Sequence, residues 1–254
     1  MCSSDLDTSY SDVSLVDLKT GARRKILEHY NGNASLSPGG NYVLYFDEAK
    51  GHWFTYRISD GARVNLTERM PVKFFDEGHD TPDLAPSLGS GGWTDGDKTV
   101  LLYDQFDIWE VRPDGTNARM ITGGEGRKNH LVFRYRSPLD LERPRPGLVV
   151  TTQPMLLTTT NDDTKATGLY RVGYAGGAPE KIVMMDKRLG PLTKAKKADV
   201  VVFTESTFNE FPDLWVSDSA LASPKKVSNA NPQQAEYVFG KAENITYIDR
   251  KSTR

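Results

Sequence analysis

The sequence predicts an all-β fold, an incomplete β-propeller of about four or more antiparallel meander blades. Three observations support this. Apolar runs of strand length alternate with turn residues along the 254-residue chain, the arrangement recurs every 40 to 60 residues or so, and helical periodicity of any length is absent. One meander cannot bury both of its faces, whereas stacked meanders share a continuous core.

Residues 92–122 are the clearest copy of the repeat. Residues 99–103 and 107–111 are strand-length apolar runs, and the second run carries Ile108 and Trp109. The sequence Arg-Pro-Asp-Gly at 112–115 is turn chemistry, because Pro presets φ and Asp-Gly tolerates positive φ. Residues 118–121 form the returning strand. Together they predict one antiparallel meander.

The other copies vary this order. We expect strands at 13–18 and 23–27 in a first, partial copy; at 42–46, 53–58 and 63–66 in a second; at 147–152, 155–160, 169–174 and 180–184 in a looser fourth; and at 199–204, 213–217 and 225–228 in the last. The residues aligned across the copies are Leu15, Tyr56, Trp109, Tyr170 and Trp215. We expect Trp109, Tyr170 and Trp215 to occupy equivalent strand positions in successive blades and to face neighbouring sheets.

The composition excludes several classes. The net charge is −2, and 37% of the residues are hydrophobic. The sequence contains no basic stripe with interleaved aromatic residues, so it does not predict a nucleic-acid partner. No apolar run approaches the roughly 20 residues of a membrane span, and no signal peptide is visible. The single cysteine, Cys2, excludes an internal disulfide and leaves the compartment open.

Both ends of the chain resemble translated sequencing-library adapter. These are the hexapeptides MCSSDL at residues 1–6 and DRKSTR at residues 249–254. We therefore expect a gene fragment assembled from metagenomic reads, with a partial propeller at 7–248 and an artefact at each end. On this hypothesis Cys2 is not native, and the missing signal peptide says nothing about the parent protein.

The candidate binding residues lie in a long polar connection between blades, residues 70–90. Long connections in a compact domain are usually functional or flexible. Its densest polar cluster supplies the candidates Asp76, Glu77, His79 and Asp80. Their carboxylates could bind a cationic substrate group or a metal ion. The alternative is a solvated loop in which Asp80 and Thr81 cap a turn. A second connection, 137–147, is rich in proline and is also expected to be an excursion between blades.

No catalytic residue, metal site or cofactor site is predicted. The chain contains no Gly-x-Ser-x-Gly nucleophile elbow, no phosphate-cradling loop and no dinucleotide fingerprint. The histidines are scattered, and none pairs at metal-ligand spacing: His29, His52, His79 and His130. Three of the four tryptophans fall in expected strands, which favours core packing over a sugar-stacking platform.

Two phrases near the end carry a resemblance. FTESTFNEFPDLWVSD at 203–218 and PKKVSNANPQQAEYVFGKAENITY at 224–247 resemble the last propeller blade of the prolyl oligopeptidase family of serine peptidases. The phrases EGHDTP at 77–82 and GWTD at 92–95 resemble the bacterial branch. The resemblance covers nearly the whole chain from Asp7.

The resemblance implies a propeller that covers a hydrolase active site and gates or helps bind peptide substrates. The family's catalytic Ser, Asp and His lie in an α/β-hydrolase domain, which would follow Ile248 and is absent here. The dipeptidyl-peptidase branch holds the substrate amino terminus with a Glu-Glu pair, which this chain lacks. Such a parent would be periplasmic or secreted, or alternatively cytoplasmic. The alternative function is a stand-alone periplasmic propeller that binds proteins, because fold does not imply function.

Overall fold

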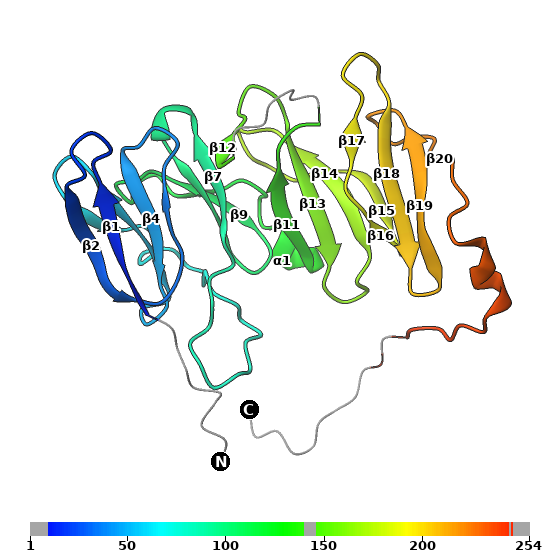
Figure 1. Cartoon of the computed structure of the whole chain (residues 1–254), viewed down its shortest axis with the longest axis horizontal. Coiled ribbons are helices and arrows are strands. Elements are labelled where there is room, and N and C mark those ends of the chain that lie inside the picture. The colour runs from blue at the N-terminus through cyan, green and yellow to red at the C-terminus, as the bar shows by residue number, and fades with distance from the viewer. Residues whose placement is uncertain (1–9, 140–145, 244, 246–254) are drawn as a thin grey trace.

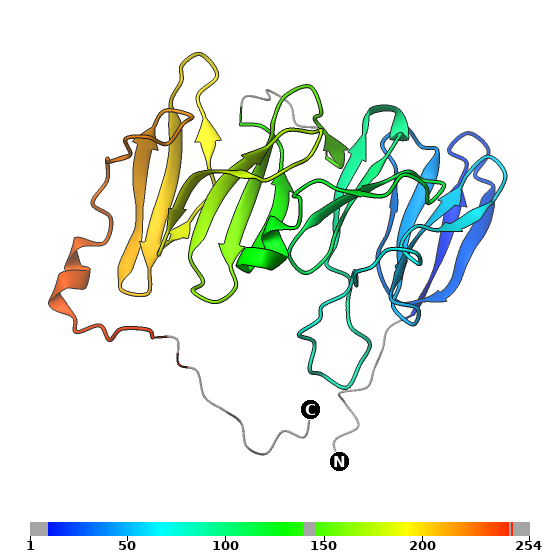
Figure 2. The ribbon, with the colours of Figure 1, turned by 180° about the vertical axis from the view of Figure 1, so that it is seen from behind.

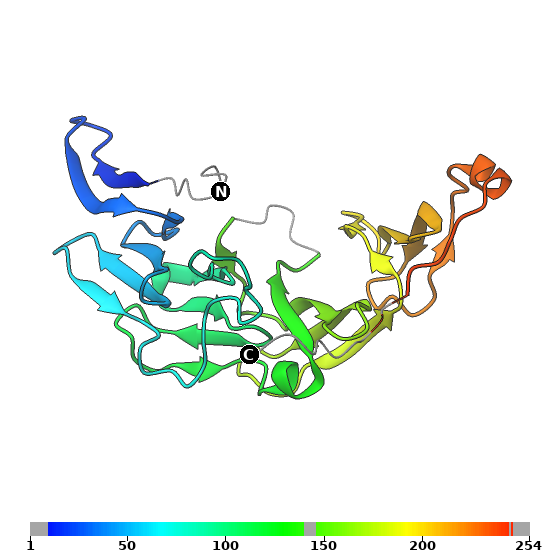
Figure 3. The same ribbon diagram turned by 90° about the horizontal axis from the view of Figure 1, so that it is seen from below.

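The computed structural model describes residues 10–139, 146–243 and 245 of the chain. In this part of the chain the strands form five sheets, which follow one another along an open arc (Figure 1 and, from behind, Figure 2). Seen from below, the sheets surround an open concave side (Figure 3). The expected all-β, incomplete propeller is confirmed. The two suspected adapter peptides, residues 1–6 and 249–254, lie outside the described residues.

The strands have the following bounds. The first sheet contains β1 (Ser11–Val16) and β2 (Arg23–Tyr30), and the second contains β3 (Ala34–Leu36), β4 (Tyr42–Asp47), β5 (His52–Arg57) and β6 (Arg63–Asn65). The third contains β7 (Ser90–Thr94), β8 (Val100–Tyr103), β9 (Ile108–Val111), β10 (Arg119–Met120) and β12 (Leu148–Val149). The fourth contains β11 (Leu131–Arg136), β13 (Met155–Asn161), β14 (Thr167–Val172) and β15 (Glu180–Met185).

The fifth sheet contains β16 (Arg188–Leu189), β17 (Thr193–Lys194), β18 (Val201–Thr207), β19 (Glu210–Ser217) and β20 (Lys225–Lys226). Helical segments are short: α1 (Glu125–Asn129) and 3₁₀ turns at Asp95–Asp97 and Pro232–Glu236. No helix in the described ranges combines the length and hydrophobicity that crossing a bilayer requires.

The fourth copy begins differently from the prediction. Residues 147–152 were expected to open it, but β12 instead pairs in parallel with β7 of the third sheet. The first strand of the fourth sheet is β11, which pairs with β13. The return to β7 depends on Gly92, at φ 102°, because the carbonyl oxygen of Gly147 lies 2.5 Å from where a Cβ would stand. The excursion after β11 therefore supplies a strand to the preceding sheet.

A recurring hydroxyl contact sets the register of the third strands. In three sheets a backbone N–H at the third strand donates to a hydroxyl that follows the fourth strand: Trp53 to Thr67 (3.1 Å), Ile108 to Thr122 (3.1 Å) and Leu214 to Ser228 (2.8 Å). Trp109 and Trp215 are therefore equivalent, as predicted. Their counterpart in the second sheet is Phe54, not Tyr56. Residues two apart face the same side of a strand, so the sequence pattern alone could not separate them.

The core is divided among the interfaces between neighbouring sheets. Trp109, 7% exposed, lies in the cluster that joins the second and third sheets. Tyr170 and Trp215 likewise pack toward the sheet that precedes their own. Leu15 is an exception to the predicted set, because it packs toward the following sheet. Counted from the turn after β1, Leu15 lies one residue away from the position that Trp109 and Trp215 occupy in their strands. Successive residues of a strand face opposite sides, so Leu15 faces the other side of its sheet.

Candidate functional site

The connection predicted to carry the site leaves β6 and returns to β7 as a large loop below the sheets (Figure 1). Its neck is closed by a bridge between Phe75 and Ser87, and the N–H of Asp76 donates to the Pro86 carbonyl oxygen over 3.0 Å. At the turn, Gly78 N–H donates to Asp76 Oδ1 over 2.9 Å. This is the Asx turn that Asp favours, and it occupies the Asp76 side chain within the loop.

Glu77 lies on the side of the loop that faces the third sheet. Arg127, in α1, donates to Glu77 Oε1 over 2.6 Å, and its guanidinium lies over the Phe106 ring at 5.2 Å. The N–H of Glu77 donates to the Gln105 side chain over 3.2 Å. Glu77 therefore anchors the loop to the sheet, and its charge is already paired.

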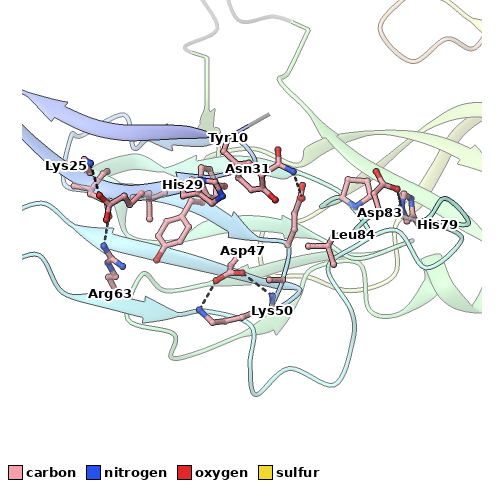
Figure 4. A pocket seen from close by; sticks show the side chains of 18 of the residues that line it. Tyr10, Lys25, His29, Asn31, Asp47, Lys50, Arg63, His79, Asp83 and Leu84 are labelled. Atoms are coloured by element: carbon pink, nitrogen blue, oxygen red, sulfur yellow. Dashed lines mark hydrogen bonds and ion pairs between the residues drawn. The ribbon is translucent and has the colours of Figure 1, made fainter. Parts of the chain in front are cut away.

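His79 turns to the opposite side, where the loop meets the first two sheets. It lines a groove of about 790 Å³ together with Asp83 from the same loop and residues of β2 and of the turn after β4. Figure 4 shows His79 and Asp83 on one side of this groove, with His29 and Tyr10 across from them. His79 Nε2 lies 2.9 Å from Asp83 Oδ1 and 2.9 Å from Thr81 Oγ1. The side chain of His79 is 17% exposed.

Two of the carboxylates that line the groove, Glu48 and Asp83, repel each other. Burial raises the pKa of Glu48, the nearby Asp83 charge raises it further, and His79 partly opposes this. Hydrogen bonds from Thr81 and His79 lower the pKa of Asp83. Asn31 Nδ2 donates to Glu48 Oε2 over 3.1 Å. An incoming cation would relieve the repulsion between Glu48 and Asp83.

The rest of the groove is polar and aromatic. Asp47 is paired with Lys50 over 2.7 Å. The Tyr30 hydroxyl donates to the Phe46 carbonyl oxygen over 2.8 Å, and burial raises the Tyr30 pKa to about 12. His29 stacks on Tyr10 with ring centroids 3.9 Å apart. The charged side chains of Lys25, Glu28 and Arg63 also line the groove.

The structure thus separates the four predicted residues. His79 lines the groove, Glu77 pairs with Arg127, and Asp76 is held in its own turn. Asp80 is exposed and has no hydrogen bond or ion pair to the described residues. The sequence reasoning missed Asp83, whose spacing of four from His79 was a usable signal. It also missed Glu48, which only tertiary contact brings to the loop.

Within the described ranges, no group of three or more His, Cys, Asp or Glu side chains is arranged to hold a metal ion.

The comparisons with known proteins bear on the fold. A scan against protein-family models and a search of the curated proteins both find no match. Among solved structures, a candidate dipeptidyl aminopeptidase IV from Bacteroides ovatus has a TM-score of 0.51 at 11% identity, covering 84% of this chain and 31% of that one. Dipeptidyl peptidase 4 from Porphyromonas gingivalis has a TM-score of 0.47 at 10% identity, covering 87% and 36%.

TolB from Acinetobacter baumannii has a TM-score of 0.42 at 11% identity, covering 85% of this chain and 48% of that one. The chain therefore spans less than half the length of each of these three proteins. At 11% identity the likeness to the Bacteroides ovatus protein concerns the fold alone.

Proposed function

We propose that this chain is the non-catalytic propeller portion of a serine peptidase of the prolyl oligopeptidase family. In this proposal the propeller covers the active site of a hydrolase domain and helps to bind the peptide substrate. The observation that carries the binding role is the groove of about 790 Å³, in which Glu48 and Asp83 lie near His79. The resemblance of residues 203–247 to the last blade of that family supports the peptidase assignment.

The groove suits a cationic group on an extended peptide. The carboxylates of Glu48 and Asp83 repel each other, and a lysine, arginine or amino-terminal charge placed between them would be attracted to both. The aromatic rings of Tyr10 and His29 offer a flat surface for the neighbouring part of the peptide. Asp76, Glu77 and Asp80, predicted from the sequence as substrate contacts, are the alternative to this groove assignment.

Binding of a cationic peptide tests this assignment. We expect an N-acetylated hexapeptide amide with a central lysine to bind this chain more tightly than the same peptide with glutamine or glutamate there. Calorimetry would give the affinities, and NMR shifts of the His79 ring would locate the contact. Glu48→Gln removes one of the two attracting charges and should weaken binding of the lysine peptide about tenfold.

Glu77→Gln is the control, because Glu77 lies on the loop that carries Asp83 but its charge is neutralised by Arg127. It should leave the lysine-peptide affinity unchanged within about twofold. Equal binding of all three peptides would contradict the groove assignment. Loss of binding in Glu77→Gln with full binding in Glu48→Gln would place the site on the loop residues predicted from the sequence instead.

This chain alone should not hydrolyse peptides. Acyl transfer needs a nucleophile, a base that activates it and donors for the oxyanion, and the sequence contains no nucleophile elbow. A panel of chromogenic peptides should release no product above the level of a buffer blank. Turnover by a pure preparation that resists removal of contaminating proteases would overturn the non-catalytic assignment.

A further inference from the structure

A second hollow, which we call the inter-sheet pocket, lies between the third and fourth sheets. Its lining comes from α1, from β11, from the turn between β13 and β14, and from β14 and β15. Figure 1 shows α1 beside β11, at the lower end of the fourth sheet. All of the lining residues fall within 125–184, so the pocket is independent of either end of the chain. Its volume of about 410 Å³ is within the range of roughly 300–1,000 Å³ that is usual for small-molecule sites.

The floor of the inter-sheet pocket is apolar and aromatic. Phe133 of β11 is fully buried, and the ring of Tyr170 in β14 packs edge-on against it, with ring centroids 5.3 Å apart. Leu131 and Met184 also line the pocket. The Met184 sulfur fills the space above Gly168, because a Cβ there would stand 2.8 Å from it. A methionine side chain is flexible, so this wall adjusts to the shape of an apolar group.

The charge of the inter-sheet pocket is positive. Its charged lining residues are Glu125 and Lys181. Glu125 is neutralised within α1, where Lys128 Nζ donates to its carboxylate over 3.0 Å. Lys181 is exposed and forms no ion pair with any residue that the structure describes. Its neighbour Glu180 is paired with Arg171 over 2.8 Å. The mouth of the pocket therefore attracts an anion.

Two hydroxyls on the same face of the fourth sheet lack partners among the described residues. Tyr170 is opposite Lys181 across the β14–β15 ladder, so the two side chains lie side by side, and the Tyr170 hydroxyl makes no hydrogen bond to that part of the chain. Thr159 is opposite Phe133 and is 3% exposed, and its Oγ1 has no hydrogen-bond partner there either. Buried hydroxyls in native proteins are usually hydrogen-bonded, so a ligand with oxygen atoms suits this face.

We propose that the inter-sheet pocket binds a small carboxylate with an apolar body. Lys181 Nζ and the Tyr170 hydroxyl donate hydrogen bonds to the carboxylate, and the body packs on the Phe133 ring and on Met184. A cation is a poor occupant, because Lys181 repels it. A free aromatic acid and the carboxyl-terminal residue of a peptide share the required chemistry. The proposal concerns the third and fourth sheets and is independent of the proposed function.

Titration of the full chain with phenylacetate tests this pocket. We expect the NMR signal of the Met184 methyl group to shift, because the ligand ring changes its surroundings. The signal of Met155, which is fully buried and outside the lining, should stay in place. Phenylacetamide has the same body without the charge and should bind about tenfold more weakly.

A short peptide distinguishes the two sources of the carboxylate. The probe is an N-acetylated tripeptide of two glycines and a terminal phenylalanine, compared with its amide. Binding of the peptide acid at least as tight as that of phenylacetate would assign the pocket to polypeptide carboxyl termini. Binding of phenylacetate without binding of the peptide would assign it to free acids. Either result supports the proposal.

Lys181→Gln removes the charge at an exposed position and should weaken phenylacetate binding about tenfold without unfolding the chain. Tyr170→Phe keeps the ring, removes the hydroxyl and should weaken binding about threefold. Lys165→Gln is the matched control. Lys165 is exposed on the turn between β13 and β14, is paired with Asp162 over 3.0 Å and does not line the pocket. This variant should bind within about twofold of the parent chain.

Four results would overturn the proposal. These are an unmoved Met184 signal at millimolar phenylacetate, equal binding of phenylacetate and phenylacetamide, equal binding by Lys181→Gln and the parent chain, and equal losses in Lys181→Gln and Lys165→Gln. The last of these would mean that phenylacetate responds to surface charge in general and not to the pocket.

Discussion

Trp109→Ala should lower the free energy of unfolding by about 3–5 kcal/mol, the usual range for truncating a buried tryptophan. The side chain is 7% exposed in the cluster that joins the second and third sheets, and its ring packs edge-on against Phe74. Its Nε1–H donates to the buried Asp104 carboxylate over 2.8 Å, so truncation also leaves that acceptor short of a donor. Urea unfolding monitored by circular dichroism measures the loss.

Trp215→Ala is the matched control for this substitution. Trp215 occupies the equivalent position in β19, near the end of the arc, and is only partly buried. Trp215→Ala should therefore lower the free energy of unfolding by roughly half as much as Trp109→Ala or less, because Trp215 buries less apolar surface than Trp109. An unchanged unfolding midpoint for Trp109→Ala would show that the register of the third strands is wrong.

Asp97→Ala should have the second large effect, a loss of about 3 kcal/mol in the free energy of unfolding. Asp97 is 3% exposed and joins the third sheet to the second. Its carboxylate accepts hydrogen bonds from Ser37 Oγ (2.7 Å), Gly39 N (2.9 Å) and Asn41 Nδ2 (2.8 Å). Removing it leaves the donors of that turn without their acceptor.

The backbone of Asp97 adds to this cost, because its φ of 55° is a conformation that Asp and Asn tolerate better than Ala. Asp97→Asn keeps that tolerance and removes only the charge, so it should cost less than Asp97→Ala. Asp95→Ala, an exposed residue of the same 3₁₀ turn, should change the free energy of unfolding by less than about 0.5 kcal/mol. Equal losses for Asp95→Ala and Asp97→Ala would contradict the role given to the carboxylate.

The contribution of the Asp97 carboxylate to the free energy of unfolding should disappear in acid. Burial raises the pKa of Asp97, but the hydrogen bonds from Ser37, Gly39 and Asn41 outweigh it and hold the pKa below the ordinary value of 3.8. A carboxylate with a lowered folded-state pKa stabilises the fold above its unfolded-state pKa and loses this effect as the pH falls through the folded-state value. The stability difference between the parent chain and Asp97→Asn should be constant from about pH 5 to 7 and shrink below about pH 4.

Urea unfolding of both proteins across this pH range measures the difference directly. Because the other carboxylates titrate in both proteins, their contributions cancel in the comparison. A difference that grows in acid would mean that the folded-state pKa of Asp97 is raised, and that burial outweighs its hydrogen bonds.

The sequence by itself determined the fold class and most of the strands. An apolar run such as residues 99–103 forms a buried strand in any antiparallel meander. The turn at Asp114-Gly115 closes the hairpin between its flanking strands. These signals are local, so the strands and turns can be predicted without knowing which sheets pack beside them. The equivalence of Trp109 and Trp215 was predictable for the same reason.

Tertiary structure decided how the sheets exchange strands and where the groove lies. The pairing of β12 with β7 depends on a close approach of Gly92 to Gly147, which no local pattern marks. The groove depends on Glu48 meeting a loop that begins more than twenty residues later, and the pairing of Glu77 with Arg127 spans fifty. Charged residues far apart in the chain interact only after the sheets have packed. The partner of each charge is therefore set by the arrangement of the sheets and not by its neighbours in the sequence.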